Sequence, residues 1–306
     1  MYKRTGIKLV TLILVSFILF SYCSRNPAPD KKVYNMSNME IDSMLQEVSQ
    51  KDFTVTERIN YYSQAFLGMP YKLKCAGDGP YALYEPWPLV NFDQTNCMVF
   101  CEHVLAMSIS DSWANFFNNL QHIRYKDGII GMKTRNHYTI GDWLPENSWL
   151  LEDVTEEVGG DNVVSVTRTI SHKQFFKNKG IKDLRYVKED REITKQVVPK
   201  EDLMKVKENT RPGDILSLIF ADKDSIFSAH MLMIIEKNGD KYIRESSNSK
   251  MTTFDTEYDE WVQNKEGMDQ YLGLIFMRVH PELNQPGKII LPWNIDEIKE
   301  GGIQQD

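Results

Sequence analysis

The stretch NFDQTNCMVFCEHVLAMS, residues 91–108, decides how the chemistry of this chain is placed. Residues 93–96 favour a turn and a helix cap, and apolar residues then recur with helical spacing. We predict a helix that begins at Cys97 and ends near Ser110. A thiol in the first turn of a helix lies at the positive end of the dipole, which lowers its pKa and favours the nucleophilic thiolate. The alternative is plain packing, because free cysteine is among the most buried residue types.

Composition excludes several functional classes. The chain has 306 residues, is 42% hydrophobic and 26% charged, and carries a formal charge of -7. An acidic chain without a basic stripe argues against nucleic acid as a partner. Neither a clustered histidine nor a Cys-x-x-Cys pair accompanies the cysteines, so we expect no metal and no cofactor.

The N-terminus is typical of an export signal. A positive segment with Lys3, Arg4 and Lys8 precedes the apolar stretch Leu9–Phe20, which is shorter than the roughly 20 residues a membrane span needs. Cys23 follows directly, as in a bacterial lipoprotein cleavage site. We therefore predict a signal peptide over residues 1–23 with lipidation at Cys23. The alternative is an ordinary secretory signal that is cleaved nearby.

The rest of the chain divides into a short linker and one folded unit. Residues 24–40 are polar, contain two prolines and are predicted to form a tether. Residues 41–306 are predicted to form a single elaborated domain, which is long enough for a large core. Within it, the apolar spacing between residues 40 and 68 predicts two helices with a break near Lys51–Val55.

Further along, the pattern changes from helices to strands. Asp111 or Ser112 is predicted to cap a helix that ends near Ile123, and the long segment 124–160 is irregular. The predicted strands cover residues 162–169, 215–220, 228–237, 240–247 and 271–279, and the charged segment 177–195 is predicted to be a surface excursion. Helices followed by antiparallel strands indicate an α+β fold.

His230 is the second residue with candidate chemistry. It lies in the predicted strand SAHMLMII, which is followed by a hairpin turn at Asn238-Gly239. A symmetric hairpin would place Ser247 opposite His230 and Glu245 diagonally on the same face, whereas a bulge would bring Ser246 or Arg244 there. One of these side chains is expected to orient the imidazole, as in nucleophilic catalysis. The alternatives are a core histidine and serines that only satisfy edge hydrogen bonds.

The cysteine count supports a free thiol. If Cys23 is lipidated, Cys75, Cys97 and Cys101 remain, and an odd number in an exported protein leaves at least one thiol unpaired. Cys97 and Cys101 are four residues apart on one helix, where their directions do not suit an unstrained disulfide.

An ordered set of segments carries a family resemblance from about Leu67 to Val279. The segments are LGMPY (67–71), NCMVFCEHVLAM (96–107), IRYKDG (123–128), RNHYTIGDWLPEN (135–147), RPGDIL (211–216), AHMLMII (229–235) and ESS (245–247). In this order they resemble the N-acetylmuramoyl-L-alanine amidase-like family of exported bacterial proteins, which belongs to the NlpC-type, papain-like cysteine peptidase superfamily.

The resemblance implies a papain-like, NlpC-type α+β fold. Its nucleophile helix packs on an antiparallel sheet, and N-terminal helices and long inserted loops surround this core. It places the nucleophile at Cys97, the base at His230, the third polar residue at Ser246 or Ser247, and the family glutamate at Glu102, which we count as a substrate-binding candidate.

This sequence departs from the family pattern beside the nucleophile and on the later strand. Asn96 replaces an aspartate, Met98-Val99 replaces a threonine pair, Cys101 replaces a valine, and Arg244 stands where relatives often have histidine. The nucleophile and the base are kept, so the chemistry is possible, while substrate preference and the third residue are open.

The segment RNHYTIGDW is predicted to form a substrate wall. Arg135 suits a carboxylate of a peptidoglycan stem peptide. Tyr138 and Trp143 suit packing on a sugar or peptide, and His137 suits a supporting position. The alternative is that Arg135 pairs with Asp142 and that Trp143 lies in the core.

Together these features predict an exported, lipid-anchored cysteine amidase or peptidase that acts on peptidoglycan fragments or stem peptides. Cys97 attacks the amide carbonyl, and His230 protonates the leaving amine. Two other functions stay open: a peptidoglycan-binding relative without turnover, and an acyl-transfer or lipid hydrolase on the same fold.

Overall fold

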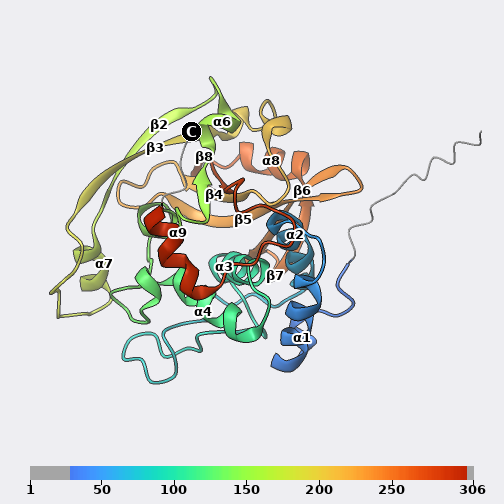
Figure 1. Ribbon diagram of the computed structural model, residues 1–306. Helices are drawn as coiled ribbons and strands as arrows, with labels where there is room; N and C mark the ends of the chain where they lie inside the picture. Colours follow the sequence, from blue (N-terminus) through green and yellow to red (C-terminus); the bar gives the residue numbers. More distant parts are fainter. Residues whose placement is uncertain (1–27, 302–306) are drawn as a thin grey trace, which may run out of the picture.

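The structure is a computed structural model that describes residues 28–301. The predicted signal peptide and Cys23 lie outside the described residues. A sheet of eight strands forms the centre, in the order β2-β3-β8-β4-β5-β6-β7, with β1 paired to β8 (Figure 1). Every pairing is antiparallel. The strands are β1 Leu151–Asp153, β2 Val164–Ile170, β3 Arg191–Pro199, β4 Ile215–Phe220, β5 Ser228–Lys237, β6 Asp240–Ser247, β7 Thr252–Glu257 and β8 Tyr271–Val279.

The helices precede, interrupt and follow the strands. They are α1 Asn38–Ser49, α2 Val55–Ala65, α3 Cys97–Ser108, α4 Trp113–Arg124, α5 Leu144–Glu146, α6 Thr155–Gly159, α7 His172–Asn178, α8 Tyr258–Glu266 and α9 Ile295–Gly301. A π-helical turn spans Thr139–Trp143. The α+β class with an antiparallel sheet, predicted from the order of the elements, is confirmed. Within residues 28–301, no helix has the length and apolar character needed to cross a membrane.

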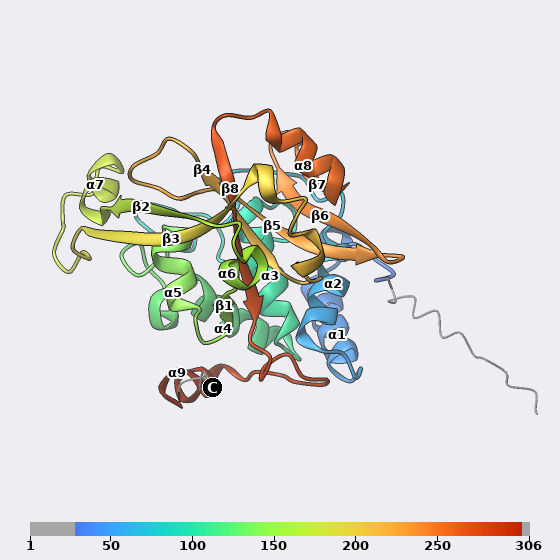
Figure 2. The ribbon, with the colours of Figure 1, turned by 90° about the horizontal axis from the view of Figure 1, so that it is seen from above.

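Apolar layers cover both faces of the sheet. Alternate residues of β4 point in opposite directions: Ile215 and Ile219 join the cluster around α1–α4, whereas Leu216 and Leu218 join the cluster around α8. Figure 2 shows α8 on one side of the sheet and α3 and α4 on the other. The run ILSLIF is therefore nearly continuously apolar because both of its faces are buried.

Local signals set the helix starts. Ser37 with Glu40, and Thr54 with Glu57, form capping boxes at α1 and α2. Ser112 caps α4 through Asn115. The two predicted N-terminal helices and their break are therefore confirmed, as is the helix predicted to follow Asp111 or Ser112.

The hairpin between β5 and β6 has the predicted turn and register. Asn238 and Gly239 both have positive φ, at 54° and 89°, which a two-residue turn of this kind requires. The strands pair from Lys237 with Asp240 to Met233 with Arg244. Among the described residues the ladder ends there, so β5 and β6 part before His230.

Two expectations about the organisation need correction. The predicted tether over residues 24–40 is wrong for its described part, because Val33 is fully buried in the core and α1 begins at Asn38. The charged segment 177–195 is also more than an excursion, because it includes the start of β3, which pairs with β2 and β8. β3, α7 and α8 were not predicted, because their mixed or charged sequences show no clear apolar periodicity.

Candidate functional site

Cys97 is the first residue of α3, as predicted. The side-chain oxygen of Asn96 accepts a hydrogen bond from the N–H of Val99 at 2.9 Å and caps the helix. The amide of Asn96 also donates to the carbonyl of Leu73 at 2.8 Å, which fixes the turn before the thiol. The helix is buried from Val99 onward, whereas Cys97 is only half-buried. The thiol therefore lies at the open end of an otherwise enclosed helix.

His230 is the third residue of β5 and faces Cys97. It lies next to a bulge in the pairing of β5 with β4. Leu218 pairs with His230 and Ile219 with Ser228, so Ala229 is the extra residue. Bulges redirect side chains and occur next to active sites. His230 is half-buried and lies where β5 has already parted from β6, which leaves room for the start of α3.

The thiol and the imidazole stabilise each other's charged forms. Burial opposes ionisation of Cys97. The positive charge of His230, its hydrogen bond and the N–H groups of Met231 and Met98 outweigh burial and lower the pKa of the thiol. Burial likewise disfavours protonated His230, but the Cys97 thiolate and Glu245 raise the pKa of the imidazole to about 10. Each charged form therefore favours the other, which shifts the pair toward thiolate and imidazolium.

Glu245, rather than Ser246 or Ser247, holds the imidazole. Its Oε2 lies 2.7 Å from Nε2 of His230, and the carboxylate is 5% exposed. Ser247 instead contacts Ser249 at 3.0 Å, and Ser246 is fully buried without a hydrogen-bond partner among the described residues. The prediction of a serine as the third residue is therefore wrong. The strands part before Ser247 reaches His230, and only the longer glutamate side chain spans the gap.

Tyr71 also borders the thiol. Burial raises its pKa, and the charges of Cys97 and Cys75 raise it further. A backbone bridge between Tyr71 and Thr95 holds it beside the start of α3. Tyr71 ends the segment LGMPY, which is part of the family resemblance, but no role was predicted for this residue from the sequence.

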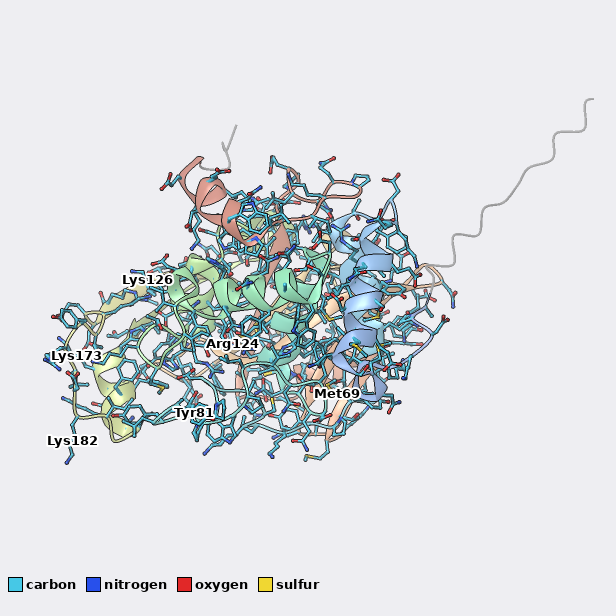
Figure 3. All side chains as sticks on the ribbon, turned by 60° about the horizontal axis from the view of Figure 1, so that its bottom comes forward. Met69, Tyr81, Arg124, Lys126, Lys173 and Lys182 are labelled. Carbon is cyan, nitrogen blue, oxygen red and sulfur yellow. The ribbon has the colours of Figure 1, made fainter. Side chains whose placement is uncertain are left out.

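Arg135 is not a free clamp for a substrate carboxylate. Its guanidinium contacts Glu85 at 2.9 Å and Asp78 at 3.5 Å, and Glu85 also binds Lys179 at 2.7 Å. The alternative pairing with Asp142 is also wrong. These contacts neutralise Arg135 and fasten the loop of residues 77–89, whose tip exposes Tyr81 (Figure 3).

The other residues of the predicted substrate wall separate into core and rim. Trp143 is fully buried, so it cannot contact a substrate, as the alternative reading expected. His137 Nε2 lies 2.7 Å from the carbonyl of Met132, and burial lowers its pKa to about 4. Tyr138 is half-buried and lines a hollow of about 70 Å³ with Ser228, two residues before His230. His137 lines the same hollow.

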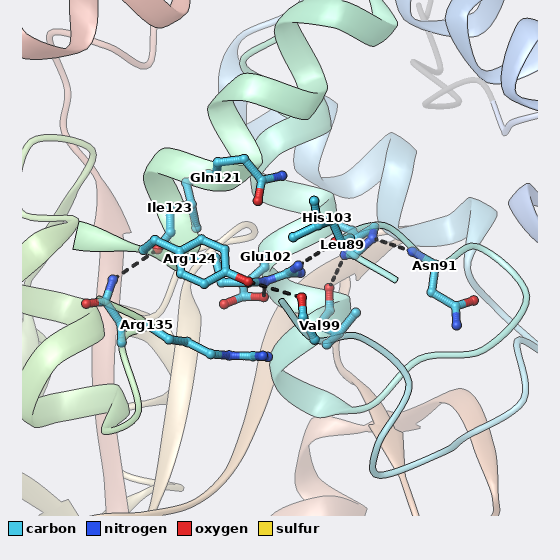
Figure 4. Close-up of polar contacts among 12 residues, drawn as sticks. Leu89, Asn91, Val99, Glu102, His103, Gln121, Ile123, Arg124 and Arg135 are labelled. Atoms are coloured by element: carbon cyan, nitrogen blue, oxygen red, sulfur yellow. Dashed lines mark hydrogen bonds and ion pairs between the residues drawn. The ribbon is translucent and has the colours of Figure 1, made fainter. Parts of the chain in front are cut away.

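Glu102 is internal and does not reach a substrate. It forms an ion pair with Arg124 at 2.7 Å, with both side chains almost fully buried (Figure 4). Arg124 also donates to the carbonyl of Leu89 at 2.5 Å. The pair joins α3, α4 and the loop before α3, so the assignment of Glu102 to substrate binding is wrong.

The acidic and nucleophilic residues in the described part of the chain do not form a metal centre. Among residues 28–301, no group of three or more histidine, cysteine, aspartate or glutamate side chains is arranged to hold an ion. Cys75, Cys97 and Cys101 are all free thiols, and burial raises the pKa of Cys75 to about 11. Of these three thiols, Cys97 is the one whose pKa is lowered.

The sequence and the fold can now be compared with known proteins. Residues 61–268 match the AmiA-like family, which is described as N-acetylmuramoyl-L-alanine amidase-like. The chain belongs to this family. No curated protein matches it by sequence.

Two solved structures share the fold. A protein from Legionella pneumophila is 20% identical, with a TM-score of 0.72 over 80% of this chain and 94% of that one. An N-acetylmuramoyl-L-alanine amidase from Bacteroides uniformis is 22% identical, with a TM-score of 0.59 over 74% of this chain and 98% of that one. At such identities the likeness establishes the fold alone.

In this member of the AmiA-like family, Arg244 has a structural role. Its guanidinium binds Asp255 at 2.7 and 2.9 Å and donates to Ser63 on α2 at 2.8 Å. The residue ties β6 and β7 to the helical layer. Adjacent strand residues point to opposite faces, so Arg244 leaves the imidazole to Glu245.

Proposed function

We propose that this protein is a cysteine-dependent amidase or peptidase that acts on peptidoglycan stem peptides. We include in the proposal that its fold is of the papain-like, NlpC type. The observation that carries it is the alignment of Cys97, His230 and Glu245, in which an activated thiol at a helix start meets an imidazole held by a buried carboxylate. Membership of an amidase-like family and an antiparallel sheet beside the helix support it.

The arrangement suits acyl transfer through a thioester. The Cys97 thiolate attacks the amide carbonyl carbon, and the backbone N–H of Cys97 at the start of α3 stabilises the oxyanion. His230 gives its proton to the leaving amine as the carbon–nitrogen bond breaks. Water then attacks the thioester, with neutral His230 taking its proton, and the thiolate is restored with the release of a carboxylic acid.

Glu245 orients His230 and favours its protonated form in this cycle. Its carboxylate binds Nε2 of His230, so Nδ1 is the ring nitrogen left to serve the thiol. The negative charge also favours the imidazolium that the thiolate needs. Removing either function would raise the pKa of the thiol and so reduce its thiolate fraction.

Export and anchoring are part of the proposal. The basic and apolar N-terminus and the position of Cys23 resemble a lipoprotein signal. An anchored enzyme outside the cytoplasm would meet cell-wall peptides directly. Labelling cells with a fatty-acid analogue tests this, because a Cys23→Ser variant should lose the label while keeping its thiol chemistry.

Mass spectrometry of purified muropeptides tests the activity. Incubation with the chain from residue 24 should yield new fragments whose masses name the cleaved bond. The Cys97→Ala variant should give none, while Cys101→Ala, a buried thiol four residues away, should still cleave. Full cleavage by Cys97→Ala would overturn the mechanism.

The same assay separates the other functions. Binding of muropeptides without fragments from either protein would indicate a binding module. Hydrolysis of fatty-acyl esters without cleavage of muropeptides would indicate an acyl hydrolase.

A further inference from the structure

The carboxylate of Glu245 has two hydrogen-bond partners, and the second comes from α8, which packs on the face of the sheet that Ile243 shares. Oε2 binds His230 at 2.7 Å, while Oε1 accepts a hydrogen bond from the indole N–H of Trp261 at 3.1 Å. Trp261 is 2% exposed. Both oxygens of the carboxylate are therefore fixed, one toward the imidazole and one toward the indole.

Trp261 belongs to α8, which lies across the sheet from α3 (Figure 2). Its ring packs in the apolar cluster that contains Leu232 and Ile234. The ammonium of Lys265, one turn later on the same helix, lies 5.2 Å from the centre of the indole ring. The site thus receives the nucleophile from one layer and the support of its acid from the opposite layer.

We propose that Trp261 is a positioning residue that aligns the Glu245 carboxylate and keeps it ionised, and so stabilises the thiolate–imidazolium pair. The inference rests on the proposed function only for its consequence in catalysis, because the state of the thiol can be measured without a substrate. A hydrogen bond to an ionised acceptor is about twice as strong as one to a neutral acceptor, so the indole N–H favours the carboxylate form.

Polar and charged groups of two elements face the Glu245 carboxylate. Glu245 faces His230 from β5 and Trp261 and Lys265 from α8. Burial raises the pKa of Glu245, but the bond and charge of His230, the charge of Lys265 and the bond of Trp261 together lower it.

Cys97 has a separate set of neighbours. Besides His230, it meets the backbone N–H groups of Met98 and Met231, and its charge acts on Tyr71 and on Cys101 one turn along α3. Within residues 28–301, no hydrogen bond or ion pair links any of these to Trp261. The polar connection from Trp261 to the thiol therefore runs through Glu245 and His230.

The test is the pH dependence of Cys97 alkylation by iodoacetamide in a Trp261→Phe variant, with the modified peptide identified by mass spectrometry. The phenylalanine keeps an aromatic ring in the core and removes the N–H donor. We expect the midpoint to rise by about half a pH unit, which leaves about threefold less thiolate at low pH. In a cleavage assay, the same variant should have a lower kcat than the wild type at acidic pH, with KM unchanged.

Tyr258→Phe is the matched control on the same helix. It removes a hydrogen bond at 3.0 Å from Tyr258 to the carbonyl of Leu203 and touches neither Glu245 nor His230. It should lower the melting temperature without moving the midpoint. If Trp261→Phe behaves in the same way, Trp261 is only structural and the proposal fails.

Lys265→Met keeps the test decisive if Trp261→Phe does not fold. Lys265 is half-buried, so its loss disturbs the core less, and the midpoint should rise in the same direction by a smaller amount. An unchanged midpoint in that variant would overturn the proposal. A shifted midpoint in a protein that cleaves no muropeptide would uphold the role of α8 and reject the proposed substrate.

Discussion

The buried pair of Glu102 and Arg124 gives a sharp stability prediction. The substitution Glu102→Gln keeps the shape of the side chain and removes its charge. It leaves the guanidinium of Arg124, which has no exposed surface, beside a neutral amide. Arg124 keeps its bond to Leu89, while its Nη2 already has no hydrogen-bond partner among the described residues.

The cost follows from leaving a charge buried without its counter-ion. Breaking a buried pair on one side typically costs about 3–5 kcal/mol, because the remaining charge is neither hydrated nor neutralised. At about 2–4 °C per kcal/mol, the melting temperature should fall by roughly 10 °C. The residual amide–guanidinium hydrogen bond places the expected loss near the lower end of this range.

Urea unfolding and calorimetry measure the change. Glu157→Gln is the matched control, because Glu157 binds Arg278 at 2.6 Å but is 53% exposed, so it should lose at most about 1 kcal/mol. The double variant Glu102→Gln/Arg124→Met removes the orphaned charge and should recover part of the loss. A Glu102→Gln variant within about 0.5 kcal/mol of the wild type would refute the reasoning.

Two further predictions concern pH. Glu245→Gln should raise the midpoint of Cys97 alkylation by about one pH unit, whereas Ser246→Ala and Ser247→Ala should leave it unchanged; a shift in either serine variant but not in Glu245→Gln would restore a serine as the third residue. Burial lowers the pKa of His103 to about 3, so folding favours its neutral form. The contribution of neutral His103 to the free energy of unfolding is complete above about pH 6.5. It falls by about 1.4 kcal/mol per pH unit toward pH 3, because the unfolded chain binds the proton first. Urea unfolding at pH 7, 5 and 4 should therefore show that the unfolding free energy of His103→Gln falls less with decreasing pH than that of the wild type. Equal pH dependence in the two proteins would contradict this.

Much of the candidate site was predictable because its signals are local. A capping asparagine followed by an apolar helix fixed Cys97 at the start of α3, and Asn238-Gly239 fixed the hairpin that carries His230. Both depend on backbone conformations within a few residues. The third residue was not predictable in this way, because it depended on where β5 and β6 part.

The misassigned residues share a physical cause. Arg135 finds Glu85, and Glu102 finds Arg124, across long stretches of chain. Ion pairs of this kind follow from how loops and helices pack, and no periodicity records them. Trp143 looked like a substrate contact because composition cannot tell a buried aromatic ring from an exposed one.

By itself, the sequence determined the α+β class, the starts of the main helices, the hairpin register and the two residues that define the candidate chemistry. Only the tertiary structure decided which acid supports His230 and that α8, which lies across the sheet from α3, binds that acid. Caps, turns and strand alternation are set by neighbouring residues, whereas the partner of a buried carboxylate is set by packing between layers.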